Sequence, residues 1–432
     1  MSPASRSAGA VVTGLGTFTP LGRGAADLFD AVCHGKSGLR RPPGDHPLAG
    51  VVDSVGMAPG ITAAEVLPPS EGRLVDRFAL MAMAAADDAI ADAGLVVGTD
   101  VDPTRVAIVV SSGAGGLTTY EAQALERDRR GPTAVSPYLL PGMLPNMATA
   151  RIAIKYGIRG WSSAIATACS AGAHAVAEAA RLIRYGEADV VVCGGAESPL
   201  NATTALAFAH AHALAHGFED PEAASRPFDR RRNGFVLSEG AGVLVVERAD
   251  FADARGAAGY ADLLGWGGST DAHRPTAPRP DGEGAAQAMR AALVSGSVDP
   301  GDVDYVNAHG TATKLGDVAE TRAIRSVFGE RSPAVSGTKS MTGHLLGGSG
   351  AVEAAICALA VAEGALPPTH NLDHPDPDCD LDHVRGGARR QDVRAVLSNS
   401  FAFGGHNVSL LLGAPSTRRT RARRDGERKE HA

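Results

Sequence analysis

The chain has 432 residues, of which 44% are hydrophobic and only 4% are aromatic, and its formal net charge is −7. This length and composition allow an extensive core of small aliphatic side chains, and the net acidity argues against nucleic acid as the main partner. Residues 416–432 differ, with seven Arg or Lys and three acidic residues, and we expect them to form a basic, disordered, solvated tail.

The cysteines are widely scattered, without the CxxC spacing of a zinc site and without the pattern of a disulfide framework. They are Cys33, Cys169, Cys193, Cys357 and Cys379. Such usage fits a reducing compartment. Because the N-terminus has no charged-then-apolar signal pattern and no apolar run approaches about 18 residues, we expect a cytoplasmic protein with no membrane partner.

Strand and helix signals alternate along the chain, which predicts an α/β fold. Continuous β-branched runs bounded by glycine indicate strands buried on both faces of a parallel or mixed sheet. The predicted strands are Gly9–Gly14, Arg105–Ser111, Asp189–Gly194 and Val243–Glu247, and the predicted helices include Arg77–Ala93 and Ala173–Tyr185.

Two stretches have the same pattern of strand, small-residue turn and Ala-rich helix. They are Ala164–Glu197 and Pro333–Ala365, the second with its helix at Ala351–Glu363. Strand-like runs also recur near Val303–Ala308 and Val393–Ser398. The pattern suggests an internal duplication, and no repeat period of about 20–50 residues indicates a solenoid.

The sequence IATACSAGAH places Cys169 where a strand-like run passes into the predicted helix. A thiol at a helix N-terminus meets free N–H groups and the positive end of the helix dipole, which favour the thiolate. The small neighbouring residues let a substrate approach closely. A buried structural cysteine is the alternative, and the other four cysteines lack this setting.

Two histidines lie in small-residue loops. His309, in VNAHGTATK, follows a predicted strand, and loops at strand ends are where ligands reach a sheet. His344, in GTKSMTGHLLGGSG, has glycines around it that permit close approach of a ligand to the backbone. This glycine-rich run lacks the GxxxxGK[ST] order of a phosphate-binding loop.

Five motifs that occur together in one order carry a resemblance to a known family. They are ATACSAG (166–172), RPFDRRRNGFVLSEGAG (226–242), VNAHGTAT (306–313), GTKSMTGH (337–344) and NSFAFGGHN (399–407). From about Val11 to Gly413 the chain resembles the β-ketoacyl-acyl-carrier-protein synthases of the thiolase-like superfamily, most closely the elongating, type II branch. Initiating members pair the cysteine with one His and one Asn, whereas this chain has His at both positions.

The resemblance implies a five-layered αβαβα fold built from two duplicated halves. We expect the first half, with the nucleophile, at residues 8–255 and the second, with the histidines and a gating loop, at residues 256–415. The implied reaction transfers an acyl group from an acyl carrier protein to a cysteine and then condenses it with a decarboxylating malonyl unit. No metal or cofactor is implied beyond the phosphopantetheine of the carrier. The implied assembly is a homodimer or a heterodimer with a chain-length factor.

By this resemblance Cys169 is the nucleophile, while His309 and His344 stabilise the enolate through Nε2–H groups. The backbone N–H groups of Cys169 and Phe403 are the expected oxyanion hole, because a tetrahedral intermediate needs two converging donors. Lys339 is expected to organise the site, with Glu353 as its charge partner.

The resemblance implies further roles for residues around the site, and at two positions this chain departs from the family. Thr311 and Thr313 match hydroxyls that bind the phosphopantetheine arm, and loop capping is the alternative. Phe403 matches the gating aromatic. Ala402 stands where the family usually has Gly, so its Cβ is expected to slow or bias the gate. Arg274 replaces a common His, which puts a pantetheine contact there in doubt.

Ala114 matches a position in the acyl pocket that often carries a larger aliphatic side chain, and its methyl group predicts a roomier tunnel. Carrier proteins are acidic, so docking needs a local basic patch on this acidic body. Our candidates are Arg73, Arg127, Arg129 and Arg130. A merely solvated arginine cluster is the alternative.

Other histidines are expected to be structural. His174, five positions after Cys169, should point away from the thiol, and His210, His212 and His216 lie in an Ala-rich helical stretch without acids or cysteines at metal-ligand spacing.

Two other functions are alternatives to a β-ketoacyl synthase. A non-catalytic chain-length-determining partner subunit would lack the nucleophile, and a biosynthetic thiolase would carry a second cysteine near FAFGGHN. The sequence leaves open whether the pathway makes primary fatty acids or a secondary metabolite.

Overall fold

The structure, a computed structural model, describes residues 9–68, 71 and 74–415. Arg73 and the basic tail at 416–432 lie outside the described residues. Five strands of the first half form a mixed sheet in the order β6-β5-β7-β8-β1. They are β1 (Ala10–Thr19), β5 (Val106–Ser111), β6 (Ser162–Ser163), β7 (Val190–Glu197) and β8 (Gly240–Arg248).

Five strands of the second half repeat this arrangement in the order β11-β10-β14-β15-β9. They are β9 (Ala261–Thr270), β10 (Tyr305–Asn307), β11 (Ala334–Ser336), β14 (Ala395–Ala402) and β15 (His406–Gly413). In each sheet the second strand pairs in parallel with both neighbours, and the last two pairings are antiparallel. The strand order therefore shows the duplication that the sequence pattern only suggested.

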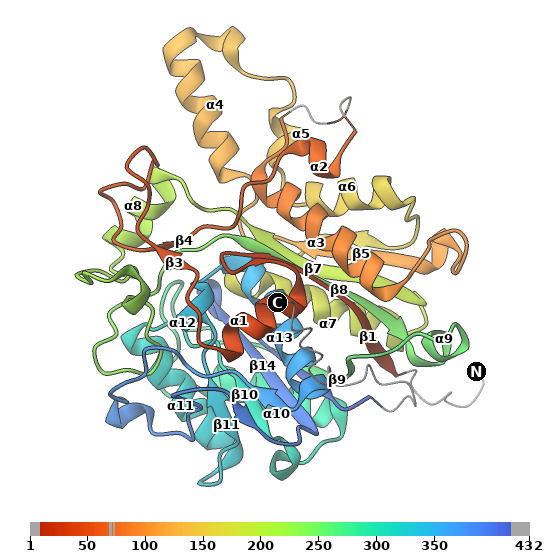
Figure 1. Cartoon of the computed structure of the whole chain (residues 1–432), viewed down its shortest axis with the longest axis vertical. Helices are drawn as coiled ribbons and strands as arrows, with labels where there is room; N and C mark the ends of the chain where they lie inside the picture. The colour runs from red at the N-terminus through yellow and green to blue at the C-terminus, as the bar shows by residue number, and fades with distance from the viewer. Residues whose placement is uncertain (1–8, 69–70, 72–73, 416–432) are drawn as a thin grey trace, which may run out of the picture.

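The two sheets join through a short antiparallel contact between β1 and β9, where Val11 pairs with Asp262 and Val12 with Ala261. Helices α7 (Ala171–Arg184) and α13 (Ser349–Glu363) lie between the sheets. Helices α3 (Arg77–Ala93) and α6 (Met147–Tyr156) cover the first sheet on its outer face. Helices α10 (Glu283–Gly296) and α11 (Lys314–Phe328) cover the second, which completes five layers (Figure 1).

Side chains alternate between layers along the central strands, because successive residues of a strand point to opposite faces. On β5, Ala107 and Val109 enter the core between the sheets, while Val106, Ile108 and Val110 enter the core under α3. The strands are thus buried on both faces, as their continuous apolar runs predicted.

Glycine permits the closest helix-to-sheet contacts, and it does so at equivalent places in both halves. A Cβ built on Gly16 of β1 would lie 1.9 Å from the carbonyl oxygen of Ala85 on α3. A Cβ built on Gly267 of β9 would lie 2.1 Å from the carbonyl oxygen of Ala288 on α10. Any side chain at either position would force the helix away from the sheet.

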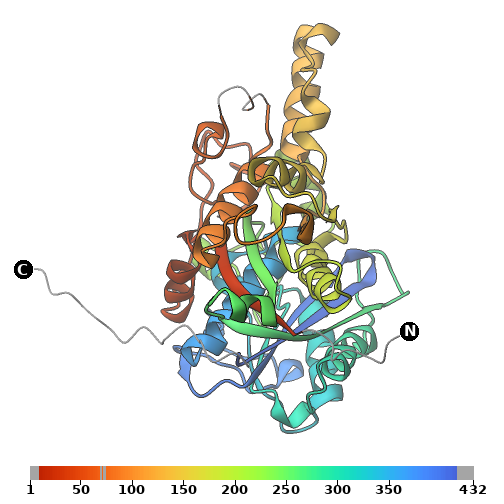
Figure 2. The ribbon, with the colours of Figure 1, turned by 90° about the vertical axis from the view of Figure 1, so that its right-hand side faces the viewer.

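Helix α4 (Leu117–Arg130) projects from the body of the protein in both ribbon views (Figures 1 and 2), and none of its residues is buried.

The remaining helices and strands border the layers. The helices are α1 (Ala25–Cys33), α2 (Ala63–Val66), α5 (Leu139–Met143), α8 (Ala202–His210), α9 (Ala249–Ala254) and α12 (Lys339–Thr342). The strands are β2 (Gly22–Arg23), β3 (Leu39–Arg40), β4 (Val55–Gly56), β12 (Ala365–Leu366) and β13 (Arg389–Arg390).

Two local expectations were wrong. The run that leads to Cys169 is not a full strand, because only Ser162 and Ser163 pair with β5. The predicted helix around the histidine-rich stretch ends at His210, since the chain reverses after it and His212 has φ 54°.

Within the described residues, one helical stretch, Leu346–Glu363, is long and apolar enough to cross a membrane by length and composition, yet 89% of it is buried inside the protein.

Candidate active site

Cys169 lies on a short 3₁₀ turn, Ala168–Ser170, directly before α7. Ala168 has φ 48°, a left-handed conformation that costs energy for a residue with a Cβ. The start of α7 approaches α13 and the turn before it closely: a Cβ on Gly172 would lie 2.8 Å from the carbonyl oxygen of Gly347, on that turn, and 3.0 Å from the backbone nitrogen of Ala351 on α13. The turn thus presents the nucleophile at the place where the two halves of the protein meet.

The Cys169 thiol is half-buried and is contacted by two backbone N–H groups, those of Phe403 and of Cys169 itself. These are the two donors expected for the oxyanion hole. Burial raises the pKa of the thiol to about 12, the nearby Lys339 charge lowers it, the Glu197 charge raises it, and the two N–H groups lower it. The two N–H groups therefore favour the thiolate, as expected at a helix terminus, but burial outweighs them and holds the pKa of the thiol above its ordinary value.

His309 follows β10 and is 8% exposed. The carboxylate of Glu320, on α11, accepts the backbone N–H of His309 and that of Gly310, each at 2.8 Å. Asn399 donates its side-chain amide to the same carboxylate at 3.3 Å. Burial raises the pKa of Glu320 to about 7, and the two N–H donors oppose this. Glu320 lies outside the motifs at 306–313 and 399–407 that hold its partners, so no direct signal in the sequence pointed to it.

Lys339 connects His309 to Glu353. The Lys339 ammonium lies 2.5 Å from Glu353 Oε1 and 3.4 Å from His309 Nδ1. Lys339 is 1% exposed and Glu353 2%. Because an ammonium can only donate, His309 Nδ1 must accept, and its proton therefore resides on Nε2.

His344 stands on the turn after α12 and is 2% exposed. Its Nδ1 lies 3.0 Å from the Ser349 hydroxyl, which can donate to it and leave Nε2–H free. The His309 and His344 rings are 5.4 Å apart between centroids and nearly perpendicular. Burial lowers the pKa of both histidines well below the usual value, and the Lys339 charge adds to this. Both imidazoles are therefore neutral N–H donors at pH 7.

A cavity of about 350 Å³ connects these groups. Eight of the residues predicted to belong to the site line it: Cys169, Arg274, His309, Thr311, Thr313, His344, Ala402 and Phe403. Lys339 and Glu353 lie behind the histidines and do not line it. The cavity brings the Cys169 thiol, its two N–H donors and both imidazoles together.

Thr311 and Thr313 stand on one wall with their hydroxyl oxygens 3.1 Å apart. Thr313 also accepts the backbone N–H of Gly316 at 3.2 Å as the N-cap of α11. The capping alternative therefore holds for Thr313, which also lines the cavity.

The loop that carries Phe403 turns sharply at Gly404 (φ 84°) and Gly405 (φ 75°), conformations that favour glycine. The Phe403 ring is 37% exposed and lies 6.2 Å from the ring of Phe208 on α8. Ala402 has φ −122°, an extended backbone that a Cβ does not strain. The Cβ of Ala402 therefore does not strain the loop in this conformation.

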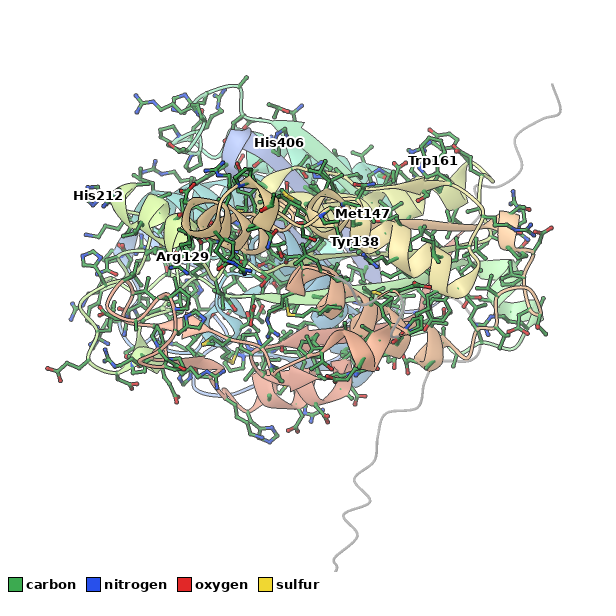
Figure 3. All side chains as sticks on the ribbon, turned by 90° about the horizontal axis from the view of Figure 1, so that it is seen from above. Arg129, Tyr138, Met147, Trp161, His212 and His406 are labelled. Atoms are coloured by element: carbon green, nitrogen blue, oxygen red, sulfur yellow. The ribbon has the colours of Figure 1, made fainter. Side chains whose placement is uncertain are left out.

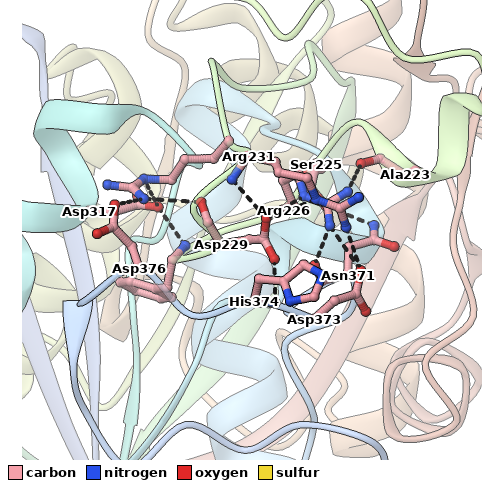
Figure 4. A network of polar contacts seen from close by, with 12 residues as sticks. Ala223, Ser225, Arg226, Asp229, Arg231, Asp317, Asn371, Asp373, His374 and Asp376 are labelled. Carbon is pink, nitrogen blue, oxygen red and sulfur yellow. Dashed lines mark hydrogen bonds and ion pairs between the residues drawn. The ribbon is translucent and has the colours of Figure 1, made fainter. Parts of the chain in front are cut away.

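A buried ionic network supports the cavity wall, and the sequence indicated it only through the motif at 226–242. Arg232 binds Asp376 at 2.6 Å and donates to the carbonyl oxygens of Thr313 and Lys314. Asp317 accepts the backbone N–H of Phe228 at 2.7 Å. Figure 4 shows the wider network around Asp317 and Asp376.

The docking candidates lie apart from this cavity, on α4. Arg127 pairs with Asp128 and Arg130 with Glu126. Arg129, which Figure 3 labels, forms an ion pair with neither of these acids. Arg73 lies outside the described residues. The structure thus leaves the proposed patch at the projecting helix, with two of its charges partly neutralised.

The remaining sequence candidates are scattered. Ala114 is exposed on the loop after β5 and donates its N–H to Glu197 at 3.2 Å. His174 bonds the Thr167 hydroxyl at 2.9 Å, and His212 stands at the cavity mouth. No group of three or more metal-ligating side chains occurs in the described part of the chain.

Comparisons with known proteins agree with this geometry. Residues 9–252 match the family model for the beta-ketoacyl synthase N-terminal domain, and residues 260–373 match that for the C-terminal domain. The 3-oxoacyl-[acyl-carrier-protein] synthase 2 of Synechocystis is 42% identical over 93% of this chain and 97% of its own.

Two solved structures are similar throughout. One is a type II polyketide ketosynthase in complex with its acyl carrier protein (TM-score 0.88, 29% identity, 95% of this chain and 100% of that one). The other is the ishigamide ketosynthase/chain length factor (TM-score 0.88, 33% identity, 95% and 100%).

Proposed function

The chain belongs to the β-ketoacyl synthase family, and we propose that it condenses an acyl group with a malonyl unit on acyl carrier proteins, in fatty acid or type II polyketide synthesis. The product is a β-ketoacyl carrier protein two carbons longer than the acyl donor. The observation that carries this proposal is one cavity holding a thiol, two N–H donors on its sulfur and two neutral imidazoles.

In the first step the Cys169 sulfur attacks the thioester carbonyl of the acyl carrier. The new sulfur–carbon bond forms as the carrier sulfur leaves, and the thiol proton passes to that leaving sulfur. The step is neutral in protons, so a resting thiol with a raised pKa is compatible with it. The N–H groups of Cys169 and Phe403 stabilise the oxyanion of the tetrahedral intermediate.

In the second step the malonyl carboxylate leaves as CO₂, and its bonding electrons form an enolate on the thioester. His309 and His344 donate Nε2–H groups to the enolate oxygen. Because neither imidazole carries a positive charge, neither readily protonates the carbanion. The carbanion attacks the acyl group on Cys169, and the sulfur leaves and takes one proton from solvent. The step uses no metal or cofactor apart from the carrier's phosphopantetheine.

The rival functions fit the cavity less well. A thiolase needs a second cysteine at the site, and Cys169 is the one cysteine among the described cavity residues. A non-catalytic partner subunit would have no use for a nucleophile supported by Lys339, Glu353 and two histidines.

We further propose that a second chain covers the face formed by α4, α5, α6 and β6. Large apolar side chains gather there, and Figure 3 labels two of them, Tyr138 and Trp161. The exposed set is Tyr120, Leu125, Val135, Tyr138, Leu140, Leu144, Ile154 and Trp161. Contiguous exposed apolar surface usually marks an interface. The second chain is either another copy or a chain length factor, as in the ishigamide structure, within the cytoplasm.

Reconstitution tests the proposal. The protein is incubated with acyl- and malonyl-carrier proteins, alone and with a candidate chain length factor, and products are read by intact mass. Formation of the two-carbon-longer β-ketoacyl carrier supports it. Absence of condensation in both arms, with carriers shown to be competent, would contradict it. Activity only in the second arm identifies the heterodimer.

A further inference from the structure

Glu197, the last residue of β7, is a buried carboxylate that the mechanism above does not use. It is 1% exposed and accepts four hydrogen bonds. Oε1 accepts the Ser112 hydroxyl at 2.6 Å and the Ala114 N–H at 3.2 Å. Oε2 accepts the Gly113 N–H at 2.7 Å and the Gly347 N–H at 3.1 Å. Burial raises the pKa of Glu197, and the four donors oppose this, because the carboxylate accepts all four at once only in its ionised form.

These donors come from two segments that border the nucleophile. Ser112–Ala114 is the loop after β5 that includes the acyl-pocket candidate, and Gly347 lies on the turn between His344 and α13. The loop also touches the nucleophile's turn: a Cβ on Gly113 would lie 3.1 Å from the carbonyl oxygen of Ala168. The carboxylate therefore ties the loop and the Gly347 turn together beside Cys169.

We propose that Glu197 is a positioning residue that fixes the Ser112–Ala114 loop against the Cys169 turn and thereby sets acyl-chain selectivity. This rests on the proposed synthase function. The four bonds leave the loop little freedom, so the carboxylate should determine how closely this loop approaches the Cys169 turn, although Ala114 itself is exposed and does not line the cavity. The backbone of His344 is held separately, because its backbone N–H donates to the carbonyl oxygen of Val236 at 2.8 Å. Malonyl decarboxylation should therefore depend on Glu197 much less than acyl transfer does.

Glu197→Gln tests the proposal, because a glutamine has one acceptor oxygen and its NH₂ must face two N–H donors in one orientation, or the Ala114 N–H and the Ser112 hydroxyl in the other. Glu247→Gln is the matched control: Glu247 is also a buried carboxylate, with Thr13 and Arg255 as partners, but it pairs with Val190 at the opposite end of β7. The readouts are acylation of Cys169 by six- and twelve-carbon acyl carriers, malonyl decarboxylation, and the pH midpoint of Cys169 alkylation by iodoacetamide.

Glu197→Gln is expected to slow acylation roughly tenfold and to change the twelve- to six-carbon ratio by at least about threefold. The alkylation midpoint should move to lower pH, because a negative charge near the thiol is removed, and decarboxylation should stay within about twofold of wild type. Glu247→Gln should lower thermal stability while it keeps the wild-type ratio and midpoint.

Ser112→Ala removes one donor and keeps the carboxylate, so it should change the ratio in the same direction by a smaller factor and serves if Glu197→Gln does not fold. An unchanged ratio and midpoint in the folded Glu197 variant, or an unchanged ratio in Ser112→Ala if the former is unfolded, would overturn the proposal. A wild-type protein that does not condense would instead refute the synthase function, which keeps the two failures distinct.

Discussion

Variants of the buried Lys339–Glu353 pair should separate an effect on stability from an effect on catalysis. The two charged atoms are 2.5 Å apart, with side-chain exposures of 1% and 3%. Removing one partner of such a pair leaves the other charge buried and uncompensated, at a cost of about 3–5 kcal/mol in the free energy of unfolding. We expect Glu353→Met and Lys339→Met each to lose stability on this scale, whereas the double variant should lose much less than the sum.

The double variant should nonetheless remain a poor catalyst. His309 Nδ1 would lose its ammonium donor at 3.4 Å, and with it the constraint that keeps the proton on Nε2. A hydrogen bond to a charged group contributes about 1.5–3 kcal/mol, so decarboxylation should fall roughly 10- to 100-fold.

Two assays separate these effects. Denaturant unfolding gives stability for the wild type, both single variants and the double variant, and CO₂ release from malonyl carrier protein gives the decarboxylation rate. A double variant that regains stability and also decarboxylates at the wild-type rate would refute the role of Lys339 in setting His309.

Further predictions concern pH, chain length and docking. In a variant without the nucleophile, malonyl decarboxylation should stay constant as the pH falls through about 6.5, because the lowered pKa of both site histidines keeps them neutral there; a fall in rate centred at 6.5 would contradict this. Ala114→Ile should cut elongation of twelve-carbon donors far more than six-carbon ones, since each excluded methylene loses about 0.8 kcal/mol; equal loss at both lengths would reject the tunnel. Charge reversal at Arg129 and Arg130 should raise the KM for carrier protein most at low salt, and unchanged kinetics there would reject the patch.

Much of the fold could be predicted because its signals are local. Helix α3 spans Arg77–Ala93 as predicted, since its apolar spacing, its Asp76 N-cap and the glycine that follows all agree. The duplicated strand order was only suggested, because pairing joins segments far apart in the sequence, such as β10 with β14. The pattern of residues within each strand does not show which distant strand it pairs with or in which register.

The residues of the site also fall into those that a local sequence motif indicates and those that it does not. The motif residues Cys169, His309 and His344 could be singled out, since each sits among small residues that imply close approach. Glu197 and Glu320 could not be singled out, because the hydrogen-bond donors that surround each buried carboxylate come from other segments of the chain. The effect of the helix terminus on the Cys169 thiol could be anticipated from the sequence, whereas the depth of burial that raises the pKa of the thiol could not.

The central claim is that a cysteine takes the acyl group while a separate histidine pair decarboxylates the extender. Cys169→Ala, incubated with acyl carrier and then with malonyl carrier, tests both parts in one sample by intact mass and CO₂ release. We predict no covalent acyl-enzyme and retained CO₂ release. A covalent acyl-enzyme in this variant, or loss of decarboxylation in a folded protein, would contradict the account.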